Sequence, residues 1–168
     1  MIIDCHTHIW QSPDQLGQLD LGEGTRGGRG RGTRISSAGK PVFRTIPAAD
    51  PDHHYSSTTA ADKSIVLGFK SRYLHAEVPN QLVSDYVKRD PTRLIGFAGI
   101  DPNDTTALEE VKLAKDKLRL RGLTVSPGDQ DFHPTDTRAM RVYALAEELA
   151  MPILFHPVGQ LTEQSKLE

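Results

Sequence analysis

The sequence predicts an α/β fold with about five parallel strands and a long loop after the first strand. From residue 64 onward, short apolar runs alternate with segments of helical periodicity. Successive runs start about 30 residues apart, which is the length of a strand–helix–strand unit. Alternation of this kind implies parallel strands joined by right-handed crossovers. The chain has 168 residues, of which 37% are hydrophobic and 25% charged, enough for one domain with a core.

The first predicted strand starts at the first residue and ends in His6-Thr7-His8. Side chains alternate across a strand, so His6 and His8 leave the same face. Two imidazoles in this arrangement suit one divalent metal ion, such as zinc, iron, copper or nickel. Asp4 shares the face and is a candidate acceptor that orients one ring. Two histidines without a ligand are the alternative. Cys5 faces the other way, which indicates a small packing residue.

Residues 11–62 are rich in Gly, Pro, Ser, Asp and Arg and show no sustained period, which predicts a lid-like insertion with little regular structure over the carboxyl ends of the strands. Residues 24–34 resemble the Arg-Gly segments that bind RNA, but no aromatic residue is interleaved, which favours a flexible loop. Its arginines suit an anionic substrate. His53 and His54 are adjacent on this loop and are interpreted as surface histidines.

The remaining elements follow in regular order. Strands are predicted at residues 64–69, 93–100, 123–126 and 151–156. Three helices lie between them. Their start signals are Pro79 with Asn80, Asp104, and Thr135 with Asp136.

His156 ends the last predicted strand, immediately before Pro157. In parallel sheets the ligand sits at the carboxyl ends of the strands, where His6 and His8 also lie. The pair from the first strand and the single histidine from the fifth would give three imidazoles around one ion. A fourth position would remain for water or substrate, as catalytic zinc requires.

These segments resemble the amidohydrolase-related family, in the branch similar to aminocarboxymuconate-semialdehyde decarboxylase. The matching stretches are residues 3–8, 79–80, 90–98, 101–102, 121–123 and 152–157. The resemblance implies a distorted TIM-type (β/α)8 barrel and one divalent metal, usually zinc. The family's ligands on strands one and five correspond to His6, His8 and His156.

Two departures from the family pattern matter. Some relatives bridge two metals with a carboxylated lysine on strand four, but residues 123–126 contain no lysine, which favours a single metal ion. The family's catalytic His and metal-binding Asp on later strands would lie beyond Glu168, and a complete barrel needs about 250 residues. The chain is therefore expected to be a single domain over residues 1–168, an incomplete barrel truncated after its fifth strand.

The resemblance implies a metal-dependent hydrolase or decarboxylase that acts on a small carboxylic acid through a metal-activated water. Arg72 and His133, near strand ends, are candidates for substrate contact, with surface residues as the alternative. A second hypothesis is a catalytically inactive metal-binding fragment that needs the missing C-terminal half. A metal-dependent nuclease or phosphatase is disfavoured, because the further ligands of such enzymes are not identifiable in the sequence.

Composition limits the partners. The formal net charge of −2 gives no reason to expect nucleic acid or an anionic membrane. No apolar run is long enough to span a bilayer, no signal peptide precedes the first strand, and the single cysteine favours a reducing compartment. The cytoplasm is the expected location. The open edge of a five-stranded sheet predicts a homo-oligomer or pairing with a complementing fragment.

Overall fold

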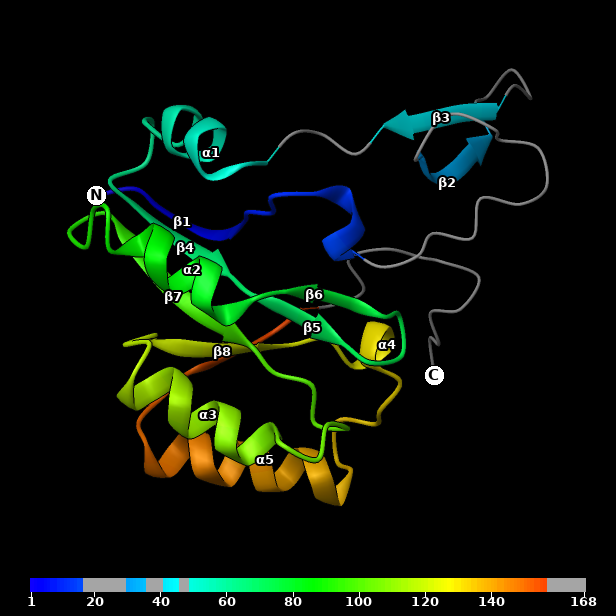
Figure 1. The fold of residues 1–168 in the computed structure, drawn as a ribbon, viewed down its shortest axis with the longest axis vertical. Coiled ribbons are helices and arrows are strands. Elements are labelled where there is room, and N and C mark those ends of the chain that lie inside the picture. The colour runs from blue at the N-terminus through cyan, green and yellow to red at the C-terminus, as the bar shows by residue number, and fades with distance from the viewer. Residues whose placement is uncertain (17–29, 36–40, 46–48, 157–168) are drawn as a thin grey trace.

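A five-stranded parallel sheet forms the centre of the molecule, with the strand order β1-β4-β7-β8-β9. The computed structural model describes residues 1–16, 30–35, 41–45 and 49–156 (Figure 1). The strands of the sheet are β1 (Ile3–His8), β4 (Lys63–Leu67), β7 (Leu94–Gly99), β8 (Gly122–Val125) and β9 (Ile153–Phe155). The α/β fold and the parallel order predicted from the sequence are therefore confirmed.

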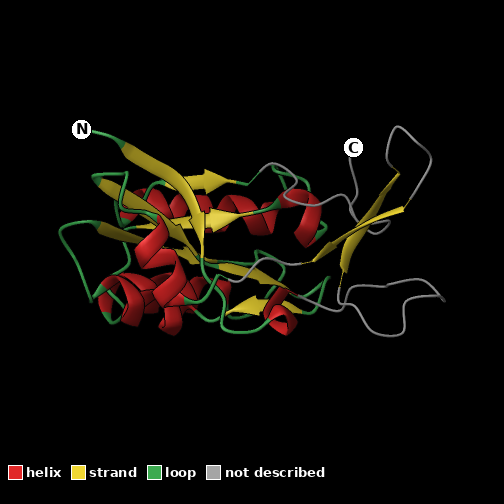
Figure 2. Ribbon diagram, turned by 90° about the horizontal axis from the view of Figure 1, so that it is seen from above, coloured by secondary structure: helices red, strands yellow, loops and turns green. Residues whose placement is uncertain are grey.

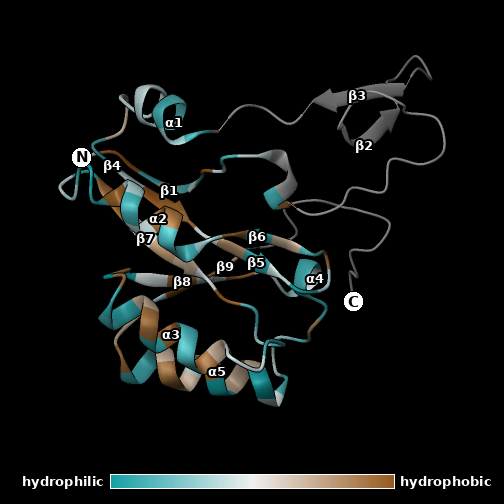
Figure 3. Ribbon diagram, viewed as in Figure 1, coloured by the Kyte–Doolittle hydropathy of each residue, from teal (hydrophilic) through white to brown (hydrophobic). Residues whose placement is uncertain are grey.

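Three amphipathic helices form the crossovers between these strands, as the periodicity predicted. They are α2 (Asn80–Val87), α3 (Ala107–Asp116) and α5 (Thr137–Glu148). Figure 3 shows hydrophobic and hydrophilic bands alternating along α3 and α5, which pack side by side. Their buried residues join those of the sheet in one core, whose fully buried members include Val66, Val83, Ile100, Val111, Leu123 and Val142. Within the described ranges, no helix has the length and apolarity needed to cross a membrane.

Several short elements lie outside the strand–helix alternation. The strands β5 (Phe69–Ser71) and β6 (Ala76–Val78) form an antiparallel hairpin after β4, and α4 (Pro127–Gln130) follows β8. The segment after β1 contains the 3-10 helix η1 (Pro13–Leu16) and the antiparallel pair β2 (Gly30–Ile35) and β3 (Pro41–Thr45). Elements of three to six residues are too short to show a period, so the sequence did not predict them.

The expectation of a long loop over residues 11–62 is wrong at its end, where α1 (Pro51–Ser57) forms the crossover between β1 and β4. Asp50 caps this helix by accepting hydrogen bonds from the backbone N–H groups of Asp52 and His53, at 3.1 and 3.0 Å. The helix lacks an aliphatic stripe, which is why its start signal went unnoticed. Of the Arg-Gly stretch, residues 24–29 lie outside the described residues, and residues 30–34 belong to β2.

His54 corrects a second expectation, because its side chain is buried rather than on the surface. Its Nδ1 lies 2.6 Å from the hydroxyl of Tyr86 in α2. The neighbouring Tyr55 donates a hydrogen bond from its hydroxyl to Asp90. Helix α1 therefore docks on α2 through aromatic side chains with polar ends, a type of packing that hydrophobic periodicity does not reveal. His53 is exposed, as predicted.

Among the described residues, β1 and β9 are the two outer strands of the sheet, and each pairs with a strand on one side only. Figure 2 shows β1 running along the outer edge of the molecule from the N-terminus. Residues 3–6 of this strand are exposed, and so are Met1 and Ile2 before it. Cys5 is exposed as well, which corrects its interpretation as a packing residue. The reason is that an edge strand leaves part of its surface uncovered.

Candidate metal centre

Three histidine side chains converge at the carboxyl end of the sheet. His6 and His8 come from β1, and His156 directly follows β9. The Nε2 atom of His6 lies 3.1 Å from Nε2 of His8 and 2.8 Å from Nε2 of His156. The ring centroids are 4.6 to 5.3 Å apart, and the ring pairs are edge-on to one another. The structure thus brings together the three residues that the strand positions predicted would meet.

This convergence requires a strongly curled sheet. His6 and His156 belong to opposite outer strands, with three strands between them. In a flat sheet, four spacings of about 4.8 Å would separate the two strands by about 19 Å. The sheet must therefore curl towards closure for the two Nε2 atoms to come within 2.8 Å. A curl of this kind is what a barrel imposes on its strands.

The three Nε2 atoms are arranged in a way that suits binding of a metal ion better than hydrogen bonding among the rings. An Nε2 atom of a neutral imidazole is either a donor or an acceptor. The His6 Nε2 atom faces two other Nε2 atoms within 3.1 Å, and a single N–H group cannot serve both neighbours well. Ligands of tetrahedral zinc, with Zn–N bonds of about 2.0–2.1 Å, lie about 3.3 Å apart. Two of the three separations are near this spacing, and all three ligand atoms lie within 4.8 Å of one another, which fits one divalent ion with an open fourth position.

The strands beneath the cluster are tied together by hydrogen bonds at their carboxyl ends. In β1 the hydroxyl of Thr7 donates to the carbonyl of Ile65 in β4 at 2.8 Å. The backbone N–H of His156 donates to the carbonyl of Val125 at 2.7 Å. The buried hydroxyl of Ser126 lies 2.8 Å from a carboxylate oxygen of Asp129 and 3.3 Å from the carbonyl of His156. These bonds hold the histidine-bearing backbone segments in place.

Asp4 contacts the backbone near the cluster. Its Oδ1 accepts a hydrogen bond from the backbone N–H of His6 at 3.1 Å. The carboxylate is exposed. Asp4 thus stabilises the chain beside His6, and its expected role as an acceptor that orients a ring stays a prediction. In the described part of the chain, the group of side chains close enough to share one ion contains His6, His8 and His156 and no carboxylate.

The two residues proposed for substrate contact lie in different surroundings. The guanidinium of Arg72, just after β5, donates from Nη1 to the carbonyl of Asn103 at 3.1 Å and borders a pocket next to the β5–β6 hairpin. His133 is exposed, and its Nδ1 lies 2.8 Å from the hydroxyl of Thr135. His133 does not line that pocket. Substrate contact by either residue remains a prediction.

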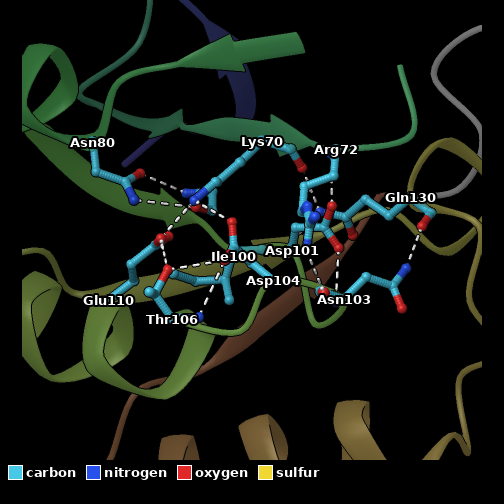
Figure 4. A network of polar contacts seen from close by, with 11 residues as sticks. Lys70, Arg72, Asn80, Ile100, Asp101, Asn103, Asp104, Thr106, Glu110 and Gln130 are labelled. Carbon is cyan, nitrogen blue, oxygen red and sulfur yellow. Dashed lines mark hydrogen bonds and ion pairs between the residues drawn. The ribbon is translucent and has the colours of Figure 1, made fainter. Parts of the chain in front are cut away.

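A polar network fixes this hairpin against the loop after β7 (Figure 4). The ammonium group of Lys70 lies 2.9 Å from Asp104 and 2.5 Å from Glu110. Burial favours the neutral amine, but both carboxylates outweigh it and raise the pKa of Lys70. Burial also raises the pKa of Asp101, whose carboxylate accepts hydrogen bonds from the backbone N–H groups of Arg72 and Asn103. The network holds the hairpin above the carboxyl end of the sheet.

Gln130 extends this network to α4 and went unnoticed in the sequence. Its side chain is buried and donates from Nε2 to the carbonyls of Lys70 and Ile100, at 2.6 and 2.7 Å. Its Oε1 accepts from the backbone N–H of Ser126 at 2.7 Å. The sequence gives no sign that a glutamine in a short polar loop is buried and hydrogen-bonded in this way.

Arg138 is a second residue that went unnoticed, although the sequence contained a sign that it is unusual. It lies in the first turn of a predicted helix, where a carboxylate is the usual residue.

Solved structures of similar fold support the barrel interpretation. A 2,6-dihydroxybenzoate decarboxylase from Rhizobium covers 98% of this chain and 52% of its own, with a TM-score of 0.58 and 16% identity. A probable 2-pyrone-4,6-dicarboxylic acid hydrolase from Acinetobacter baumannii, with citric acid bound, covers 92% of this chain and 49% of its own, with a TM-score of 0.55 and 15% identity. At identities this low, the structural similarity establishes the fold alone.

A third similar structure is a 5-carboxyvanillate decarboxylase from Novosphingobium aromaticivorans that contains manganese. It covers 62% of this chain and 34% of its own, with a TM-score of 0.53 and 18% identity. The chain thus spans about half the length of the first two relatives and a third of this one. A comparison with curated protein sequences gave no match.

The curled sheet is accordingly part of a TIM-type barrel, with its five parallel strands in barrel order. The family model described as "Amidohydrolase" matches residues 3–167, which is nearly the whole chain and includes all three histidines. The chain therefore belongs to the amidohydrolase family.

Proposed function

We propose that this chain carries the metal centre of a hydrolase or decarboxylase that acts on a small carboxylic acid. The single observation behind the proposal is the convergence of the Nε2 atoms of His6, His8 and His156 at the carboxyl end of the sheet. Zinc is the proposed ion, because three imidazoles and an open fourth position are its usual catalytic environment. Membership of the amidohydrolase family supports the proposal that the protein is an enzyme. That this chain is itself active is part of the proposal.

The three histidines would act as neutral ligands, each through its Nε2 atom. A bound divalent ion would supply an acidified water, since it lowers the pKa of that water towards neutrality. The protein's contribution is to keep the donors pre-arranged: β1 holds two of them on one face, and the bond from His156 N–H to Val125 holds the third. The backbone contact of Asp4 fixes the chain beside His6.

The substrate class rests on two kinds of support. The names of the similar structures include 2,6-dihydroxybenzoate, 5-carboxyvanillate and a pyrone dicarboxylic acid, all of which are small carboxylic acids. In this chain, Arg72 presents a guanidinium group at a pocket on the hairpin that extends β4. Guanidinium groups bind carboxylates in a bidentate manner. Hydrolysis and decarboxylation both remain within the proposal.

A second candidate function is a metal-binding unit whose chemistry depends on residues from another polypeptide. The observation in its favour is that the histidine cluster, as far as the chain is described, contains no carboxylate. The relatives are also about twice as long. A missing general acid or base typically lowers the rate by about 10²–10⁴-fold. The first candidate predicts turnover by the chain alone, and the second predicts metal binding without it.

Metal analysis tests the shared part of both candidates. The purified chain, dialysed against zinc and then against metal-free buffer, should retain one zinc per chain as measured by mass spectrometry of the elements. His6→Asn and His156→Asn should each lower zinc retention at least tenfold, because each removes one of three ligands. His133→Asn is the matched control, since His133 is exposed and contacts Thr135. Equal zinc retention in all four proteins would contradict the proposed site.

Turnover separates the two candidates. The zinc-loaded chain would be assayed on hydroxybenzoates and on pyrone dicarboxylic acids, beside a version extended to a full barrel. Turnover by both proteins that disappears in His6→Asn supports the first candidate. Turnover by the extended version alone, with zinc bound to both, supports the second.

A further inference from the structure

The side-chain amide of Gln130 joins the carboxyl ends of three neighbouring strands of the main sheet. Its Nε2 donates to the carbonyl of Lys70, in the hairpin that follows β4, and to that of Ile100, directly after β7, at 2.6 and 2.7 Å. Its Oε1 accepts from the backbone N–H of Ser126, directly after β8, at 2.7 Å. We propose that Gln130 is a positioning residue of the metal centre, which fixes the backbone that presents His156. The inference rests on the metal-binding role proposed for the histidine cluster.

The bond to Ser126 reaches His156 through a single peptide group. The carbonyl of Val125 and the N–H of Ser126 belong to the same peptide unit, which is planar and resists rotation. On one side of this unit, the carbonyl accepts the backbone N–H of His156 at 2.7 Å. On the other side, the N–H donates to Gln130. Gln130 therefore holds the peptide plane to which the backbone of His156 is attached.

His156 depends on this attachment more than the other two histidines do. His6 and His8 lie within β1, a strand of six residues, and His8 is in register with Leu67 of β4. His156 instead follows β9, a strand of three residues that pairs with β8 alone in the part of the chain that the structure describes. A tilt of the Val125–Ser126 peptide would thus carry the His156 backbone with it, and with it the ring whose Nε2 lies 2.8 Å from Nε2 of His6.

Gln130 is itself fixed in place. Its side chain is 1% exposed, and its backbone N–H donates to the carbonyl of Ser126 at 2.9 Å. Its own carbonyl accepts from Nδ2 of Asn103 at 2.6 Å (Figure 4). Both N–H donors of its side-chain amide are used. A reversed amide would place its oxygen against two carbonyls, so the neighbours determine its orientation.

A residue that only stabilises the fold would act differently from a positioning residue. Loss of any buried hydrogen bond lowers stability, and all parts of the fold then open more often. Loss of a bond that positions His156 acts first at the carboxyl end of β9 and changes the arrangement of the metal ligands. The two cases are separated by where the change appears and by the geometry of the bound metal.

The first test measures amide hydrogen exchange by NMR in the full chain, freed of metal with EDTA. Gln130→Met keeps an unbranched side chain of similar length but removes all three side-chain hydrogen bonds. Exchange of the His156 amide should accelerate about tenfold more than exchange of the Leu123 amide, as expected for the loss of one buried hydrogen bond. Leu123 is the internal reference, because its N–H donates to the carbonyl of Pro152 at 2.9 Å, at the other end of the pairing between β8 and β9.

The second test measures metal binding. Zinc affinity should fall about 10- to 100-fold in Gln130→Met, which is typical for loss of a residue that supports a metal ligand. The visible absorption bands of bound Co²⁺, which depend on the arrangement of its ligands, should change as well. Ser84→Ala is the matched control. Its hydroxyl is fully buried and donates to the carbonyl of Leu118 at 2.8 Å, before the amino end of β8. This variant should lose stability but keep its zinc affinity and its Co²⁺ bands.

Three results would each overturn the proposal: equal acceleration of the His156 and Leu123 amides, unchanged zinc affinity and Co²⁺ bands in Gln130→Met, or the same changes in Ser84→Ala. If Gln130→Met does not fold, Gln130→Asn takes its place, since it keeps the amide but withdraws it by one methylene group. An unaltered chain that binds no zinc would contradict the metal centre itself. Because the exchange rates are measured without metal, they decide separately whether Gln130 fixes His156.

Discussion

His54 is a titratable side chain held in a setting that disfavours its charged form. The ring is 7% exposed, with Nδ1 against the Tyr86 hydroxyl and a buried Nε2 that has no hydrogen-bond partner among the described residues. Burial lowers the pKa of His54. Among the charged groups around it, Asp4 of β1 opposes this shift, whereas Arg93 and protonated His53 add to it. The neutral ring is therefore the form that packs between α1 and α2.

This setting predicts a loss of stability in mild acid. The pKa of His54 is lower in the folded chain than in the unfolded chain, where it is near 6.5. The unfolded chain therefore binds more protons, so stability is complete above pH 6.5 and falls as the pH drops below it. The urea midpoint should decrease between pH 7.5 and 5.5. His54→Gln should reduce this decrease. His53→Gln, which changes an exposed neighbour, should leave it intact, and an unchanged slope in both variants would contradict the assignment.

At the residue scale, strand geometry explains which side chains were predictable. The alternation of side chains put His6 and His8 on one face, and the carboxyl-end rule added His156, so local sequence was sufficient. Cys5 and His54 were misjudged for the opposite reason. Their burial depends on what covers β1 and on how α1 docks against α2, and both are tertiary facts. From the sequence, Arg138 could be recognised only as a residue that departs from the usual preferences of a helix start, because the sequence does not show which residues lie near it.

At the element scale, Asn80 joins the start of α2 to the end of β7. The sequence indicated that this side chain caps the helix, but α2 has no side-chain cap. The amide instead forms two hydrogen bonds with the backbone of Gly99, accepting from its N–H at 2.8 Å and donating to its carbonyl at 3.1 Å. A side chain at Gly99 would overlap the backbone of Phe69, so the strands approach too closely here for another residue.

Asn80→Asp is expected to lower the free energy of unfolding by about 1–3 kcal/mol. Aspartate keeps the acceptor for the Gly99 N–H but places a carboxylate oxygen against the Gly99 carbonyl. The measurement is chemical denaturation at pH 7, where the carboxylate is ionised. Gln81→Glu, the same change at the exposed position next to it, serves as the control, because the bond from Gln81 to Asp85 that it removes is exposed to solvent and contributes little. Equal effects at both positions would show that the bond to Gly99 contributes little.

The ion pairs of Lys70 give a prediction for the β5–β6 hairpin. Burial opposes ionisation of Asp104, but hydrogen bonds from Lys70 and from Thr106 outweigh it and lower the pKa of Asp104 to about 2. The folded chain thus binds fewer protons than the unfolded chain, whose value is 3.8. Stability from this group is complete above pH 3.8 and is lost as the pH falls towards 2. This lowering of the pKa of Asp104 corresponds to a contribution of about 2 kcal/mol to the free energy of unfolding at neutral pH.

Asp104→Asn should therefore lower stability at pH 7 by about 2 kcal/mol and shrink the loss between pH 4 and 2. Chemical denaturation at both ends of this range measures the difference. Asp85→Asn is the control, because Asp85 pairs with Lys88 on an exposed face of α2 and its pair contributes little. A loss between pH 4 and 2 that stays the same size in Asp104→Asn would contradict the role given to the Lys70 pairs.

The elements that alternate as strand and helix around the main sheet were predictable from residue 63 onward. β4, β7, β8, β9 and three crossover helices follow from apolar runs and helical periods, because burial against a sheet imposes both patterns. The β5–β6 hairpin and α4 are held by Lys70, Asp101 and Gln130 instead. Such contacts join residues that are 29 to 60 positions apart, so no local pattern records them. The same hairpin carries the pocket, which explains why the pocket escaped prediction.

At the scale of the whole molecule, the sheet has two open edges that meet through their histidines. Hydrophobic side chains are exposed on both, with Ile3 on β1 and Phe155 on β9 at 41% and 46%. Edge strands with exposed backbone groups favour association with other chains. In the histidine cluster, Nε2 of His6 in β1 lies 2.8 Å from Nε2 of His156, the residue that follows β9. A bound ion would therefore link the first and last strands directly.

This geometry predicts that metal binding stabilises the whole fold rather than the site alone. Zinc at 100 times its dissociation constant should add about 2.7 kcal/mol, provided that it binds the folded chain only. For a chain of this length, that corresponds to a rise of about 5–11 °C in Tm. The rise should vanish with EDTA and in His156→Asn, which removes the one histidine of the described cluster that comes from the β9 side. His133→Asn should keep it. If His156→Asn kept the full rise, the ion would be held by β1 alone and the two edges would not be joined through it.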